Sequence, residues 1–76
     1  MKNLLADIAK QMVDNPDQVI VNEIDGDQTI VFELSVARAD LGQIIGKQGR
    51  HIGAIRTIMM GISGKIQKRI VVELLE

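Results

Sequence analysis

The stretch "IIGKQGRHI", Ile44–Ile52, decides how this chain folds. Two glycines, Gly46 and Gly49, enclose Lys47 and Gln48, and isoleucines stand on both sides. Glycine takes the positive φ angle of a helix C-terminus at little steric cost, and a new apolar repeat begins after the second glycine. The stretch therefore predicts a sharp turn between two helices.

The helices on either side of this turn are predicted from apolar spacing and capping residues. The first spans 40–45, with Asp40 as its N-cap, and the G-x-x-G loop spans 46–49. The second spans 50–61, and Met60 near its end is expected at an exposed partner surface. The buried side of this second helix is expected to carry the apolar residues at helical spacing: Ile52, Ile55, Ile58, Met59 and Ile62.

The rest of the chain predicts one helix and three strands. The helix spans 3–14, and the strands span 18–24, 28–36 and 67–75. Asn15-Pro16 ends the helix, and Asp25-Gly26-Asp27 forms a hairpin turn between the first two strands. The expected fold is α+β with the order α-β-β-α-α-β, in which three helices pack on one face of a three-stranded mixed sheet. The crossover through two helices favours a third strand parallel to the second.

Length and composition limit the class of protein. The 76 residues suit a single small domain over 1–76. There is no cysteine, which suits a reducing compartment. The charged residues of the opening segment do not fit a signal peptide, and no apolar run reaches membrane-spanning length. We expect a soluble, cytoplasmic protein.

Charge is distributed unevenly along the chain. The net charge is −1, yet residues 1–37 hold two cationic against seven acidic side chains, whereas residues 38–76 hold seven against three. The G-x-x-G loop lies in the positive half. A local positive field attracts a polyanion even when the total charge is near zero.

The predicted turn has the chemistry of a phosphate site. The amides of Gln48, Gly49 and Arg50 are candidates for unpaired N–H groups at the start of the second helix. Lys47 at the tip adds a charge-assisted contact. The neighbouring isoleucines offer an aliphatic surface to flat groups: Ile44, Ile45 and Ile52. Phosphate at the loop and bases on this surface describe a single-stranded nucleic acid.

These residues resemble the KH domain, whose motif is an aliphatic pair, G-x-x-G with a basic residue, and a following aliphatic residue. The element order resembles the bacterial type II KH fold. The segments "MVDNPDQV" and "IGKQGRHIGAIRT" are similar to those of the KhpA family of small bacterial RNA-binding proteins, and the similarity covers nearly the whole chain.

The resemblance implies RNA binding by a loop that grips the backbone of about four nucleotides. Carried over by position, the loop is Gly46, Lys47, Gln48 and Gly49, the groove residues are Ile45 and Ile52, and Arg50 and Arg56 are supporting cations. His51, the only histidine, is expected near the loop as an additional phosphate contact. The resemblance also implies a homodimer, or pairing with a larger KhpB (Jag/EloR)-like protein, in work linked to cell elongation and division.

A second interpretation is a protein-interaction module that keeps the KH fold while RNA binding is secondary. The hairpin turn is short and acidic, and Phe32 is the only aromatic residue. Single-strand binders commonly stack bases on aromatic side chains. If RNA is bound, we therefore expect binding that is weak and broad in sequence.

Other motifs are weaker. Gly42–Gln48 has too few residues between its glycines for a P-loop. A second G-x-x-G, Gly61–Gly64, has no basic residue and is expected to stop the second helix. One histidine without cysteine predicts no metal site, and no nucleophile stands with a base, so neither a cofactor nor catalysis is expected.

Overall fold

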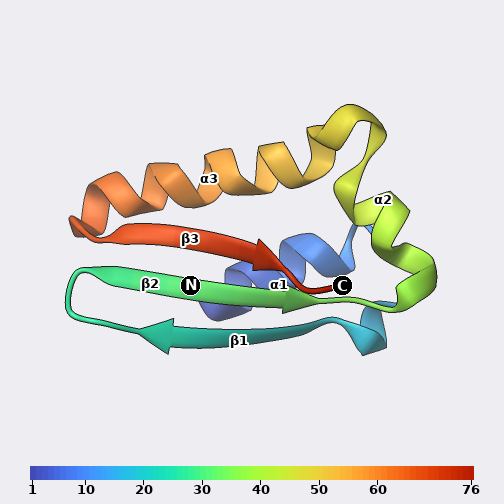
Figure 1. Ribbon diagram of the computed structural model, residues 1–76, viewed down its shortest axis with the longest axis horizontal. Helices are drawn as coiled ribbons and strands as arrows, with labels where there is room; N and C mark the ends of the chain where they lie inside the picture. The colour runs from blue at the N-terminus through green and yellow to red at the C-terminus, as the bar shows by residue number, and fades with distance from the viewer.

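The computed structural model describes residues 1–76 and contains three helices and a three-stranded sheet (Figure 1). The elements are α1 (Lys2–Lys10), β1 (Ile20–Asp25), β2 (Thr29–Ser35), α2 (Leu41–Ile45), α3 (Arg50–Ile66) and β3 (Arg69–Leu74). Single 3₁₀ turns occur at Pro16–Gln18, Arg38–Asp40 and Lys47–Gly49. The predicted order α-β-β-α-α-β is confirmed. None of the helices has the length and apolarity required to cross a membrane.

The sheet is mixed, as predicted. β1 pairs antiparallel with β2, and β3 pairs parallel with β2 on its other side, so β1 and β3 are both edge strands. The amide of Gly26 donates to the carbonyl of Thr29 over 2.8 Å and closes the predicted hairpin turn. The crossover from β2 to β3 contains both α2 and α3, and the G-x-x-G loop lies between these helices.

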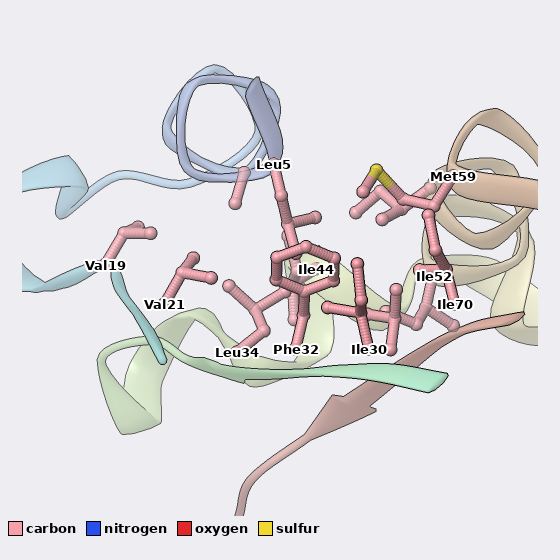
Figure 2. Close-up of a cluster of buried hydrophobic side chains, with 13 residues drawn as sticks. Leu5, Val19, Val21, Ile30, Phe32, Leu34, Ile44, Ile52, Met59 and Ile70 are labelled. Carbon is pink, nitrogen blue, oxygen red and sulfur yellow. The ribbon is translucent and has the colours of Figure 1, made fainter. Parts of the chain in front are cut away.

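All three helices lie on one face of the sheet, where Figure 2 shows their side chains meeting those of the strands. Alternate residues of β2 point to this core, and Phe32 is fully buried among them. Apolar burial of this kind is the main force that stabilises a small domain. The core cluster consists of Leu5, Ala9, Val19, Val21, Ile30, Phe32, Leu34, Ile44, Ile52, Ile55, Met59, Ile70 and Val72.

The first helix is shorter than predicted, because it ends at Lys10 rather than at residue 14. The segment after it is held by Asp40, whose side chain is only 1% exposed. The Asp40 carboxylate accepts hydrogen bonds from the Asn15 backbone amide at 3.0 Å and from Asn15 Nδ2 at 3.2 Å. Asp40 lies at the N-cap position of α2, as predicted, but its side chain forms no capping hydrogen bond to that helix, because the carboxylate bonds to Asn15 instead. Its backbone has α-region angles, whereas a capping residue is typically extended.

The predicted end of α3 at Gly61 is also wrong, since this helix continues through Gly61 and Gly64 to Ile66. A glycine inside a helix costs only about 1 kcal/mol relative to alanine. Packing of Ile62 against the core outweighs this cost. The helix ends at Gln67, whose φ of 56° is in the left-handed region.

Candidate nucleic-acid interface

The G-x-x-G loop has an unusual backbone. Three of its four residues have positive φ angles, 76° at Gly46, 58° at Gln48 and 73° at Gly49. The amide of Gly46 donates to the Gly42 carbonyl over 2.9 Å and ends α2, as the sequence predicts. The chain then makes one 3₁₀ turn before α3 begins at Arg50.

Two of the three amides predicted to be free are already used inside this turn. Gly49 donates to the Gly46 carbonyl over 3.1 Å, and Arg50 donates to the carbonyl of Lys47. The sequence indicated a helix start with open donors, but the chain satisfies them by 3₁₀ bonding. Of the three amides that were predicted to be free, only that of Gln48 is not used in this turn.

The polar side chains of the loop point to solvent. Lys47, Gln48, Arg50 and His51 are all exposed. The Arg50 guanidinium donates to Gln48 Oε1 over 3.3 Å, so that these two side chains are aligned beside one another. His51 Nδ1 lies 2.7 Å from the carbonyl oxygen of Gln43, on the other side of the loop. The loop therefore presents two cations on a narrow, tightly turned backbone.

The predicted aliphatic surface is mostly occupied by the core. Ile52 is only 7% exposed and Ile44 is fully buried. Ile45 is half-buried and packs against the core from outside. The positions beside the G-x-x-G loop were predicted to contact bases, but two of these three isoleucines hold α2 and α3 to the sheet instead.

The exposed apolar surface lies farther along α3. A groove of about 510 Å³ runs between α3 and the edge strand β3, which lie side by side in Figure 1. Met60 on its wall is 67% exposed, as the sequence suggested for this residue. The groove is lined by Arg56, Met60, Ser63, Arg69, Ile70, Val71, Val72 and Glu73.

Most of these lining residues were missed from the sequence. The apolar residues Val71 and Val72 are adjacent within a strand, and nothing in the pattern shows that this strand is an edge. The sequence singled out two of the lining residues, Arg56 as a supporting cation and Met60 because it falls outside the buried stripe that contains Met59. The groove becomes visible only when β3 is placed beside α3.

Arg56 joins the two walls of this groove. Its Nε and Nη2 atoms donate to the Val72 carbonyl oxygen at 3.3 and 3.2 Å. The amides of Arg69 and Leu75 donate to Gln28 and Leu34 on the β2 side. Because backbone groups alternate in direction along a strand, the Val72 carbonyl faces away from β2, at the open edge of the sheet. Arg56 thus lies in the groove and not at the loop. Two of its N–H groups bond to the protein itself, which leaves fewer donors for a ligand.

The acidic hairpin turn is at the opposite end of the molecule from the G-x-x-G loop (Figure 1). Lys68 Nζ lies 3.0 Å from Asp25 Oδ1 and 3.3 Å from the Gly26 carbonyl oxygen, so one of the acidic side chains is paired. The positive charges of Lys47 and Arg50 are therefore closer to an anion bound at the loop than the carboxylates of the hairpin turn are.

Comparisons with known proteins agree with this architecture. A family model described as "KhpA/KhpB, KH domain" matches residues 2–74. The chain is 52% identical over 75 residues to the RNA-binding protein KhpA of Clostridium acetobutylicum, covering 99% of this chain and 100% of that protein. It is 51% identical over 76 residues to the RNA-binding protein KhpA of Aquifex aeolicus, covering 100% and 96%.

A third relative, the RNA-binding protein KhpA of Chlamydia pneumoniae, is 46% identical over 76 residues, which cover all of this chain and 97% of that protein. No solved structure matches the chain at a significant level. The similarity extends over the loop, both flanking helices and the whole sheet, and the element order is that of the type II KH fold. The chain therefore belongs to the KhpA/KhpB family of KH domains.

Proposed function

We propose that this protein is a non-catalytic module that binds single-stranded RNA, with the G-x-x-G loop on the backbone and the groove between α3 and β3 on the bases. The observation that carries the proposal is the position of Lys47 and Gln48. Both side chains are exposed at the tip of a backbone with positive φ angles, which lets a phosphate approach closely. The names of the relatives support RNA as the ligand.

Binding is expected to be weak and broad in sequence. The groove has no aromatic residue on which a base stacks, and Phe32 is buried in the core. Stacking contributes about 1–3 kcal/mol per base in single-strand binders. Without it, affinity depends on phosphate contacts and on apolar contact with residues such as Met60.

We further propose that the protein acts as a homodimer or with a larger KhpB (Jag/EloR)-like partner, in post-transcriptional regulation or RNA chaperoning linked to cell elongation and division. The family resemblance motivates this proposal. Exposed apolar side chains on α3 support it, because they are available for protein contacts. They are Met60, Ile66 and Ile58, and Ile58 was expected on the buried side of the helix but is 46% exposed. The same side chains favour the second candidate, an interaction module in which RNA binding is secondary.

The double substitution K47D/Q48D tests the leading proposal. It reverses the charge at the loop tip without touching a core residue, so RNA crosslinking should be lost while the helical circular dichroism is retained. The sequence offers a matched control at the end of α1, where Lys10 and Gln11 are also adjacent and exposed. The K10D/Q11D variant has the same change in composition and net charge and should bind RNA nearly as wild type does.

The two candidate functions give different results in this comparison. If K47D/Q48D binds RNA as well as K10D/Q11D does, the loop is not the RNA site. If wild type has no measurable affinity for single-stranded RNA at low salt, the interaction module becomes the better account. A salt titration should show a shallow slope, because few phosphate contacts release few counterions.

A further inference from the structure

The carbonyl of Gln43 needs a partner from outside its own helix. Gln43 lies in α2, which has only five residues, and the last carbonyls of a helix have no partner within it. The chain turns away at Gly46, whose amide closes the helix on Gly42. His51 supplies the missing contact across the loop, because its Nδ1 atom lies 2.7 Å from the Gln43 oxygen.

This contact selects the tautomer of the neutral imidazole ring. A carbonyl oxygen only accepts hydrogen bonds, so the nitrogen 2.7 Å from it must carry a proton. In the neutral ring the other nitrogen, Nε2, then has no proton. Neutral His51 consequently has its donor directed to Gln43 and has no donor left for a phosphate.

The same histidine packs against the glycine corner. A Cβ atom added to Gly46 would lie 2.6 Å from His51 Cγ, 2.8 Å from His51 N and 2.9 Å from His51 Cβ. Gly46 has φ 76° and ψ 171°, a region of backbone conformation that is essentially restricted to glycine. His51 therefore touches the corner of the loop through its ring carbon and bonds the base of the loop through its ring nitrogen.

The loop needs such constraints. Gln48 has left-handed angles without being glycine, and residues in such regions persist only where the surroundings hold them. The His51–Gln43 hydrogen bond connects the last turn of α2 to the first turn of α3, and all four loop residues lie between its two ends. It is a brace across the base of the G-x-x-G loop.

We propose that His51 is a positioning residue, which holds the loop in its RNA-binding shape through the Nδ1–H donor, and is not itself a phosphate contact. This inference rests on the proposed RNA-binding function of the loop. It replaces the role that the sequence suggested for His51. A phosphate contact at this position would use the outward ring nitrogen, Nε2, or a positive charge, whereas the brace uses only the N–H donor at the place of Nδ1.

Three substitutions separate these roles by RNA affinity. His51→Asn keeps an N–H donor at the same number of bonds from the backbone and has no charge. His51→Ala removes the donor, and His51→Lys removes it while adding a cation. Because one neutral hydrogen bond corresponds to about a three- to tenfold change in equilibrium, we expect His51→Ala and His51→Lys to bind single-stranded RNA about three- to tenfold more weakly, and His51→Asn to approach wild type.

Helix propensity strengthens this test, because asparagine is a poorer helix former than alanine or lysine. Recovery in His51→Asn therefore cannot come from a more stable α3. If His51→Lys binds as tightly as wild type while His51→Asn binds like His51→Ala, His51 acts as a cationic phosphate contact and the proposal is overturned. Equal affinity of all three variants and wild type overturns it as well.

The imidazole gives a second measurement that does not depend on RNA. Long-range ¹H–¹⁵N correlation spectra of the free protein at pH 8 should show the neutral His51 ring protonated at Nδ1. A ring protonated at Nε2 rules out the hydrogen bond to Gln43. This measurement separates the two proposals, since a chain that fails to bind RNA but shows the Nδ1–H form retains the brace and loses only the proposed function.

Discussion

The chain contains two G-x-x-G segments, Gly46–Gly49 and Gly61–Gly64, and they adopt different structures. The first is a loop in which both glycines have positive φ angles. The second lies within α3, where both glycines are helical. The identical spacing therefore does not by itself specify a turn.

The two segments also differ in the room for a side chain at their first glycine. A Cβ on Gly46 would overlap His51, whereas nothing lies within 4 Å of the corresponding position on Gly61 or Gly64. The first segment requires glycine, and the second only tolerates it. The distinction depends on the neighbours of each segment, namely the isoleucines and the second helix start around the first, and the continuous apolar face of α3 beside the second.

The largest effect is expected from Gly46→Ala. The new methyl group meets His51, and alanine is strained at this backbone conformation, which together should lower the free energy of unfolding by about 2–4 kcal/mol. Urea denaturation measures this loss, and RNA affinity should fall with it. Unchanged stability would show that the corner does not have the conformation described.

A smaller effect is expected from Gly49→Ala. This position has left-handed angles but open space around the added methyl group, so only the backbone strain of about 1–2 kcal/mol applies. Urea denaturation of both alanine variants side by side should rank Gly46 above Gly49. The reverse ranking would contradict the close approach of His51 to Gly46.

In the second segment, Ser63→Ala should cost about 1 kcal/mol, because Ser63 Oγ donates a hydrogen bond to the Lys68 carbonyl at the junction of α3 and β3. Thermal unfolding measures this loss. Ser63→Thr keeps the hydroxyl and is the matched control. If both variants are equally unstable, the hydroxyl bond does not stabilise the junction.

The smallest expected effect is a gain in stability. Gly61→Ala should raise the free energy of unfolding by about 0.5–1 kcal/mol, since alanine is the better helix former and the added methyl group meets nothing. Chemical denaturation detects this gain. Destabilisation by this substitution would mean that Gly61 is a helix end, as its sequence suggested.

Local patterns predicted most of the fold. The alternation of Ile30, Phe32 and Leu34 in the predicted strand 28–36 is a local pattern that matches the buried face of β2. The crossover rule placed β3 parallel to β2. The turn at Gly46 was predicted because glycine takes the positive φ angle that ends a helix, which depends on this residue alone. The strand and the turn are determined by residues close together in sequence, whereas the parallel pairing of β3 follows from the general topology of a crossover connection.

The misses involve residues that are distant in sequence. Asp40 had the residue type of a helix cap, but its carboxylate bonds Asn15, which is 25 positions away. The groove depends on β3 being an edge strand next to α3. His51 reaches back eight positions to Gln43. None of these contacts produces a repeating residue pattern in the sequence, so they are seen only in the folded structure.

The central claim is that RNA meets the loop Gly46–Gly49 and the groove between α3 and β3. Titration of single-stranded RNA into ¹⁵N-labelled protein tests it most directly, with amide chemical shifts as the readout. We predict saturable shifts at Gly46–Gly49 and along the groove at Met60 and Val71, with little change at Asn22 and Ile24 on the opposite edge strand. Shifts confined to β1 and α1, with the loop amides unmoved, would contradict the account.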